Sequence, residues 1–191
     1  MAIPIIQTSL PEDLQKPDEA SLIAAAKKDP REFGQIYNLY VQPIFRYLNS
    51  RIGSLPEAED ATAQTFLAAL EALDRYQHKG HLAAWLFAIA RRKATDHFRA
   101  QRQQVPLEYA ENVPSETDLL KQVIQTEQIT ALAKLIAALP EEEHELVRLR
   151  YIAGLSFSEI GRLLNRTEAA VKKLLYRLLA RLQSQLEVPH E

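Results

Sequence analysis

Basic residues are concentrated in two segments of this 191-residue chain. Anion binding by these segments is the chemistry that the sequence indicates most clearly. Residues 91–102 hold five Lys or Arg residues against Asp96, and residues 162–181 hold six against Glu168. Guanidinium and ammonium groups at helical spacing bind phosphates, so each segment is a candidate anion-binding surface. Charged runs are also common on solvated helix faces, and either segment taken alone is open to both interpretations.

The positive charge is local, because the whole chain has a formal net charge of −2 at pH 7. Acidic residues dominate residues 57–74, with five and no Lys or Arg, and residues 105–128, with five against one lysine. A general nucleic-acid binder is usually basic overall. The sequence therefore predicts basic surfaces separated by acidic segments.

Residues suited to catalysis or metal binding form no recognisable pattern. The chain has no cysteine, which excludes disulfides, thiolate zinc sites and cysteine nucleophiles. Its five histidines lack metal-ligand spacing, and no glycine-rich phosphate-binding loop is present. We therefore expect a binding protein that uses no metal and no cofactor, and not an enzyme.

The second basic segment belongs to a pair of short helices around a polar turn, over residues 156–182. Ser156 and Glu159 have the spacing of a capping box, which predicts a helix that begins at Phe157. Asn165 tolerates the left-handed conformation that ends a helix, and Thr167 can cap the next one. A turn of about three residues is the length found in helix-turn-helix motifs.

The second helix of this pair has an apolar side and a basic side. Its apolar face is expected to comprise Val171, Leu174, Leu175, Leu178, Leu179 and Leu182. A basic outer face with small residues at its start suits insertion into the major groove. The candidate DNA-binding residues are Arg166, Thr167, Ala169, Lys172, Lys173, Tyr176 and Arg177. A leucine-rich hairpin with a solvated face, or a dimer-forming coiled coil, would show the same pattern.

Apolar residues recur at helical spacing along most of the chain, and strand-like alternation is absent. This predicts an all-α fold, with helices near residues 18–28, 33–52, 54–73, 82–104, 119–139 and 141–153 before the closing pair. Asp18 and Ser54 are expected to cap helices, and Gly53 to end one. Pro43 is expected to kink or divide its helix.

Two helical domains are expected, at residues 18–104 and 119–186, because the segment between them is acidic and twice interrupted by proline. Residues 105–118 are the expected acidic linker, and residues 1–17 and 187–191 the tails. The N-terminus lacks a basic region and a long apolar run, and no stretch has the character of a membrane span. We expect a cytoplasmic protein without membrane insertion.

Four motifs in order resemble the extracytoplasmic-function (ECF) group of bacterial RNA polymerase sigma factors. The motifs are DPREFGQIYNLYVQPIFRYLNSRIG, AEDATAQTFLAAL, AWLFAIARRKATDHFR and LPEEEHELVRLRYIAGLSFSEIGRLLN. Each motif alone is weakly specific, but four in series around a linker in the family's position are strongly so. The resemblance spans residues 18–186.

The resemblance implies a function for each charged segment. The N-terminal domain would melt the minus-ten promoter element, and the closing helix-turn-helix would read the minus-thirty-five element. Core polymerase would be bound through Glu59, Asp60, Gln64, Thr65 and Phe66. Contacts around the minus-ten element would come from Tyr76, Gln77, His78, Arg91, Arg92, Thr95, Arg99 and Arg102. The arginines among these would hold phosphates.

The implied partners are core RNA polymerase, promoter DNA and an anti-sigma factor, by which members of the family are commonly held inactive. The acidic linker would thread through the polymerase channel that later takes the RNA. From charge alone, we also expect the isolated factor to bind DNA poorly until polymerase separates its domains, because each basic helix could face acidic segments of the chain.

Departures from the family pattern leave the promoter sequence open. Ala169 and Ala170 stand where many relatives have a Gly-Thr pair, Lys173 replaces a typical serine, and Leu174 occupies a usually basic position.

A stand-alone helix-turn-helix regulator is an alternative, but it leaves the acidic helix, the minus-ten-like helix and the linker unexplained. A helical interaction module with no DNA role is the third possibility.

Overall fold

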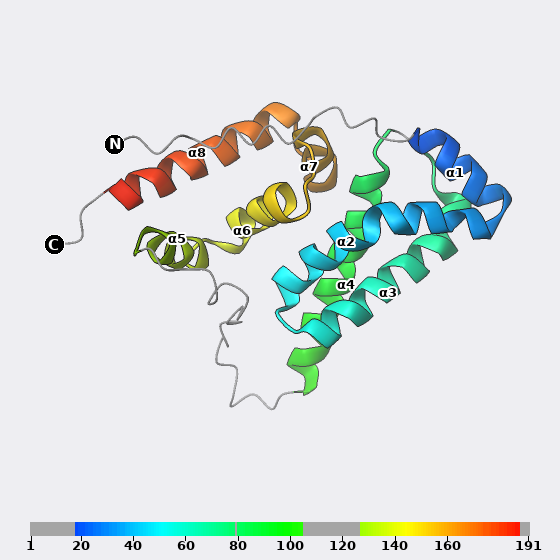
Figure 1. Cartoon of the computed structure of the whole chain (residues 1–191), viewed down its shortest axis with the longest axis horizontal. Helices are drawn as coiled ribbons and strands as arrows, with labels where there is room; N and C mark the ends of the chain where they lie inside the picture. The colour runs from blue at the N-terminus through cyan, green and yellow to red at the C-terminus, as the bar shows by residue number, and fades with distance from the viewer. Residues whose placement is uncertain (1–17, 79, 105–126, 188–191) are drawn as a thin grey trace.

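The computed structural model describes residues 18–78, 80–104 and 127–187, and every regular element within these ranges is helical (Figure 1). The elements are α1 (Glu19–Lys28), η1 (Pro30–Glu32), α2 (Phe33–Ile52), α3 (Leu55–Ala72), η2 (Leu73–Arg75), α4 (Leu82–Gln104), α5 (Glu127–Ala137), α6 (Glu141–Val147), η4 (Arg148–Ile152), α7 (Phe157–Leu164) and α8 (Glu168–Glu187). The all-α prediction is confirmed. The predicted tails, the linker at 105–118 and a helix start at residue 119 lie outside the described residues.

Local signals set most of the helix ends in the N-terminal half. Asp18 caps α1 by accepting a hydrogen bond from the Ala20 amide at 3.2 Å, and Gly53 ends α2 with a φ of 81°. Ser54 occupies the N-cap position of α3, but its side chain makes no capping hydrogen bond, so only its position was predicted correctly. Pro43 does not divide α2, which continues through it as one helix.

The long helix α2 packs against both α3 and α4. Its buried face recurs at threes and fours, as an amphipathic helix requires, through Phe33, Ile36, Ile44, Tyr47, Leu48 and Ile52. The shorter α1 lies against α2 and η2 and completes the N-terminal half. Through Lys27, α1 also contacts the segment between α3 and α4.

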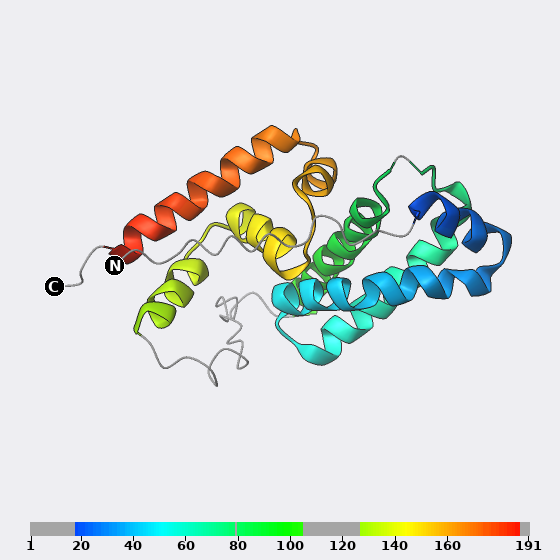
Figure 2. The ribbon, with the colours of Figure 1, turned by 45° about the horizontal axis from the view of Figure 1, so that its top comes forward.

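The C-terminal half is built around α8, which packs against α5, α6 and α7 (Figure 2). Val171, Leu175, Leu178 and Leu182 are buried, as the apolar pattern predicts. Leu179 is 36% exposed and was wrongly placed on that face, because it lies one step beyond the arc that the other helices cover. No helix in the described residues has both the length and the apolar character needed to cross a membrane.

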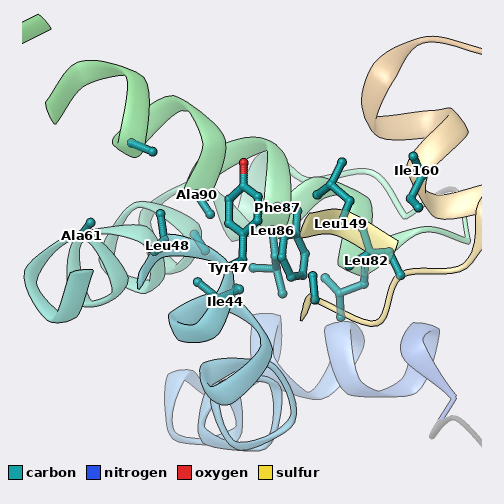
Figure 3. Packing of buried hydrophobic residues seen from close by; sticks show 14 of the residues in the cluster. Ile44, Tyr47, Leu48, Ala61, Leu82, Leu86, Phe87, Ala90, Leu149 and Ile160 are labelled. Atoms are coloured by element: carbon teal, nitrogen blue, oxygen red, sulfur yellow. The ribbon is translucent and has the colours of Figure 1, made fainter. Parts of the chain in front are cut away.

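The two halves pack against each other through one continuous apolar cluster. Leu149 and Ile160 from the C-terminal half join the cluster that contains Leu82 and Phe87 of α4, and all four are almost completely buried (Figure 3). Helix α7 contacts α4, and η4 contacts α2. The first helix of the closing pair therefore lies on the helix that carries the other basic segment.

Candidate nucleic-acid interface

The closing pair of helices forms the predicted helix-turn-helix, and each local signal is visible. Ser156 and Glu159 make a full capping box, in which the Glu159 amide donates to Ser156 Oγ at 3.2 Å and the Ser156 amide donates to Glu159 Oε2 at 2.7 Å. Asn165 ends α7 in the left-handed conformation with a φ of 54°. Thr167 Oγ1 accepts from the Ala170 amide at 3.2 Å and caps α8.

A glycine absent from the sequence-based prediction controls how closely the turn approaches α7. The Gly161 carbonyl accepts a hydrogen bond from the Arg166 amide at 2.8 Å, which folds the turn back over the helix. A Cβ atom at this position would lie 2.7 Å from the Arg166 carbonyl oxygen, closer than such atoms approach in proteins. The turn therefore requires glycine at position 161.

The outer face of α8 offers charged and aromatic side chains to solvent. Lys173, Tyr176 and Arg177 are exposed, as are the small Ala169 and the capping Thr167. Lys172 is half-buried and pairs with Glu168 at 2.7 Å. The face therefore presents hydrogen-bond donors and positive charge, which can contact base edges and phosphates.

An aromatic residue from α7 extends this face in a way that the sequence did not reveal. The Phe157 ring lies 6.2 Å from that of Tyr176, and Arg150 stacks over Phe157 at 4.4 Å from its centroid. Lys172 Nζ lies 5.4 Å from the same centroid. Since these residues come from three separate helices, helical spacing offered no signal that they would meet.

Acidic residues of α6 pair with two residues of the second basic segment. Arg166, a predicted DNA contact, lies 3.8 Å from the Glu142 carboxylate, and Arg181 forms an ion pair with Glu143. Among the described residues, these acidic partners come from the start of α6. DNA phosphates would compete with these carboxylates for the same cations.

The basic side of α4 was predicted to hold phosphates, and its arginines differ in their surroundings. Arg92 is exposed and lies 3.8 Å from Asp96, one turn along the same helix. Thr95 Oγ1 donates a 2.9 Å hydrogen bond to the Arg91 carbonyl. Arg99 is exposed, and the side chain of Arg102 lies outside the described residues. These contacts are short-range, so the exposed arginines of α4 can turn toward phosphates.

Arg91 instead reaches the C-terminal half, where Glu145 is the centre of a buried ionic cluster. Arg91 Nε lies 3.2 Å from Glu145 Oε1, and Arg51 Nη1 donates to both carboxylate oxygens at 3.1 Å. Tyr47 Oη donates to Oε1 at 2.8 Å. Glu145 is only 4% exposed, so it needs these partners to be tolerated in the interior.

The tyrosine of this cluster acts as a donor under ordinary conditions. Burial, followed by the charge of Glu145, raises the pKa of Tyr47 well above its usual range, so the hydroxyl keeps its proton. The Tyr47 hydroxyl accepts a hydrogen bond from Arg51 Nη1 at 2.7 Å and donates one to Glu145 Oε1. Three side chains of the N-terminal half thus converge on one carboxylate of the C-terminal half.

The segment Tyr76–His78, between η2 and α4, was predicted to meet an extruded base. The Tyr76 ring stacks on Trp85, with the centroids 4.2 Å apart and the rings inclined by 24°. Tyr76 is therefore already occupied by an aromatic partner. Gln77 is exposed, and His78 is half-buried, with an Nδ1 atom that has no hydrogen-bond partner among the described residues.

The predicted polymerase-binding residues of α3 divide between its surface and the core. Glu59, Asp60 and Gln64 are exposed, and Gln64 Nε2 donates to Asp60 Oδ2 at 2.6 Å. Thr65 is fully buried, and its hydroxyl donates to the Ala61 carbonyl at 2.7 Å, so it offers nothing to a partner in this conformation.

Phe66 is also a core residue, at 4% exposure, and its ring packs edge-on against Phe33 and Tyr37. Its neighbour Leu67 is the most exposed of three exposed leucines on this helix, at 58% against 54% for Leu55 and 39% for Leu70, and the sequence-based prediction omitted it. Leu67 lies seven residues after Asp60 and hence on the same face of the helix. The surface of α3 is therefore acidic and polar with an apolar centre.

The chemistry of these surfaces is that of binding. No group of three or more His, Asp or Glu side chains within the described ranges could hold a metal ion. The exposed side chains of α4 and α8 supply positive charge and hydrogen-bond donors, and those of α3 supply carboxylates and apolar side chains. The first two suit a polyanion, and the third suits a protein with a basic rim around an apolar pocket.

Comparison with known proteins assigns both halves. Residues 36–104 match the model of Sigma-70 region 2, and residues 129–182 match that of Sigma-70, region 4. The ECF RNA polymerase sigma factor ShbA of Streptomyces griseus is 32% identical, over 78% of this chain and 84% of that protein. The ECF sigma factor BldN of Streptomyces coelicolor is 33% identical, over 76% of this chain and 56% of that longer protein.

The arrangement of helices has a solved counterpart. The sigma factor RpoE of Bartonella quintana, solved in complex with the anti-sigma factor NepR, aligns with a TM-score of 0.58 and 21% sequence identity. The alignment covers 84% of this chain and 99% of that one. At this level of identity the likeness concerns the fold.

Proposed function

This chain belongs to the ECF group of RNA polymerase sigma factors, and from that premise we propose that it binds core RNA polymerase and directs it to specific promoters. The observation that carries the proposal is the pairing of two basic helical surfaces, on α4 and α8, with an acidic and apolar surface on α3. A DNA-binding protein that acts without polymerase has no use for the third surface.

The helix-turn-helix reads the minus-thirty-five element. Exposed Lys173, Tyr176 and Arg177 on α8 contact base edges and nearby phosphates in the major groove, while Thr167 and Ala169 let the start of the helix approach the DNA. Arg166 and Lys172 add phosphate contacts at the edges of this face. Arg166 first exchanges its partner Glu142 for DNA.

The N-terminal half binds the minus-ten element. Arg92 and Arg99 hold phosphates of the strands that separate, and Arg91 and Arg102 join them when the DNA is engaged. Gln77 and His78 meet a base that has left the stack, an event that costs a few kcal/mol and requires an ordered acceptor site. Tyr76 supports this site through its stack on Trp85.

Core polymerase is bound through the exposed face of α3. Glu59, Asp60 and Gln64 supply the polar rim of this interface, and Leu67 supplies its apolar centre. Thr65 and Phe66 hold α3 in place from inside the core. Electrostatic complementarity with a basic surface on polymerase sets the register and the rate of association.

The proposed function divides the chain into two domains and a linker. Residues 18–104 form the polymerase-binding and promoter-melting domain, residues 119–186 form the helix-turn-helix domain, and residues 105–118 connect them as an acidic linker. In the structure, where the two halves pack against each other (the closed arrangement), Arg91 pairs with Glu145. Polymerase binding separates the domains and releases the cation for DNA.

The partners and location follow from the same family. An anti-sigma factor holds the chain inactive until its signal arrives, as NepR is bound to RpoE in the solved complex. Since its template and polymerase are in the cytoplasm, the chain acts there. The chemistry of RNA synthesis belongs to the polymerase, and the chain supplies recognition.

The test is transcription with purified full-length chain and bacterial core RNA polymerase, followed by mapping of the start sites. We expect a stable complex in gel filtration and initiation at defined sites only when the chain is present. Association with duplex DNA but not with core polymerase would identify a stand-alone regulator instead. Association with neither would identify a helical interaction module.

A further inference from the structure

Helix α1 lies against the segment between α3 and α4, and it is tied to that segment at both ends. At one end, Lys27 Nζ donates hydrogen bonds to the Asp74 carbonyl at 3.1 Å and to the Tyr76 carbonyl at 2.7 Å. At the other end, Glu19 Oε2 accepts a hydrogen bond from the Leu82 amide at 3.0 Å. The residues between these ties include Gln77 and His78.

The contact from Glu19 supplies α4 with a cap from another helix. Leu82 is the first residue of α4, so its amide has no partner within that helix. A carboxylate at this end also interacts favourably with the helix dipole. Glu19 Oε1 accepts a hydrogen bond from the Tyr40 hydroxyl at 3.2 Å, which fixes the orientation of the carboxylate.

The contact from Lys27 satisfies carbonyls where the chain leaves η2. Two carbonyls held by one ammonium group define the direction in which the chain continues. The Tyr76 ring is held independently by its stack on Trp85, which lies on α4. The backbone and the ring of Tyr76 are thus fixed by different helices, and Gln77 follows directly.

Helix α1 precedes residues 36–104, which match region 2. We propose that Glu19 and Lys27 are positioning residues for promoter recognition, which hold the two ends of this segment so that Gln77 and His78 meet the minus-ten strand in one orientation. This inference rests on the proposed function of the chain. Ordering the segment before DNA arrives removes an entropic cost of binding and favours the bases that fit that orientation.

The experiment uses the full chain with core polymerase and a promoter library in which the minus-ten and minus-thirty-five elements are randomised. RNA sequencing ranks the promoters for each variant, while gel filtration measures core binding and thermal melting measures folding. Lys27→Met keeps the aliphatic stem and removes the ammonium. Loss of a charge-assisted hydrogen bond should lower transcription from the preferred minus-ten sequences about tenfold.

The expected loss is selective. Lys27→Met should flatten the ranking of minus-ten sequences, with core binding, melting temperature and minus-thirty-five preference unchanged. Lys27→Arg, which retains the charge and has enough N–H donors for both carbonyls, should restore the ranking. Lys28→Met, at the neighbouring lysine that is exposed like Lys27, should behave like wild type. Glu19→Gln provides an independent route to the same flattening.

Two results would overturn the inference. One is an unchanged ranking for both Lys27→Met and Glu19→Gln. The other is a uniform loss on every promoter accompanied by a lower melting temperature, which would make α1 a purely structural support. Failure of the wild-type chain to bind core polymerase or to initiate would instead refute the proposed function, so the two failures are distinguishable.

Discussion

The side chains of α8 divide between a buried apolar face and an exposed basic face. Val171, Leu175 and Leu178 are buried, whereas Lys173 and Arg177 are exposed on the opposite side. Lys173 and Arg177 are four residues apart from each other and are hence neighbours on the helix surface. A single helix therefore has one face for the core and another for the proposed DNA contact, and substitutions on one face should leave the other intact.

Lys173→Ala and Arg177→Ala should each weaken binding to minus-thirty-five DNA by about tenfold, because a good base contact is worth about 1–3 kcal/mol. The measurement is the affinity of the holoenzyme for promoter DNA at several salt concentrations. A residue that contacts only phosphate should reduce the slope against salt by about 1 and affect all sequences alike. Lys134→Ala, an exposed lysine on α5, is the control.

On α3, Leu67 and Phe66 should behave in opposite ways although they are adjacent. Leu67→Ala, at a side chain 58% exposed, should leave the unfolding free energy within about 0.5 kcal/mol of wild type and weaken core binding roughly tenfold. Phe66→Ala empties a core position and should cost about 3–5 kcal/mol. Denaturant unfolding and a core-binding titration measure the two effects. Normal core binding by Leu67→Ala would remove this residue from the interface.

At the scale of elements, the helix-turn-helix depends on a close approach between α7 and the turn that follows it. The capping box sets where α7 begins and Asn165 sets where it ends, but neither sets the distance between α7 and the turn. That distance is set at Gly161, where a Cβ atom would lie 2.7 Å from a backbone oxygen. The oxygen belongs to a carbonyl that cannot move without shifting the start of α8.

Gly161→Ala should therefore destabilise the C-terminal half by about 1–3 kcal/mol, the usual cost of overpacking, and tilt α8 relative to α7. We expect weaker minus-thirty-five binding with normal core binding. Gly34→Ala is the matched control, because a Cβ atom there meets nothing within 4 Å and alanine favours the helix. Equal melting temperatures and DNA affinities for the two variants would contradict the prediction.

At the scale of the whole molecule, the two halves share an apolar cluster and one buried carboxylate. Glu145 accepts hydrogen bonds from Tyr47 and Arg51 and pairs with Arg91, all from the N-terminal half. Charged groups removed from water are stable only while their partners remain. The packing of the two halves therefore depends on Glu145, which also pairs with Arg91, a residue proposed to contact promoter DNA.

Glu145→Gln should favour separation of the two halves. It removes the charge that compensates buried Arg51, a change that typically costs about 3–5 kcal/mol, and opening restores water to the arginines. We expect a larger radius of gyration by small-angle scattering and tighter binding of free factor to duplex DNA. Glu141→Gln, whose exposed carboxylate contacts Arg148, is the control. An unchanged radius and affinity would show that this cluster does not hold the domains closed.

The sequence by itself determined the local features, because these depend on residues close together in the chain. Helical spacing predicted the all-α fold, and caps and turn residues predicted the ends of α1, α2 and α7 to within a residue or so. The order of four motifs identified the sigma family. The exposed basic face of α8 followed from its period, since residues three and four apart share a face.

Tertiary packing decided which polar and apolar groups are available. The period of α3 did not distinguish Thr65 and Phe66, which are buried, from Leu67, which is exposed, because burial depends on where α2 and α4 lie. In the sequence, Glu145 is one acid among several in a charged run. Only the fold places Arg51, which is 94 residues away in the chain, within hydrogen-bond distance of it. Ion pairs and close approaches between distant elements depend on positions in space, which no local period encodes.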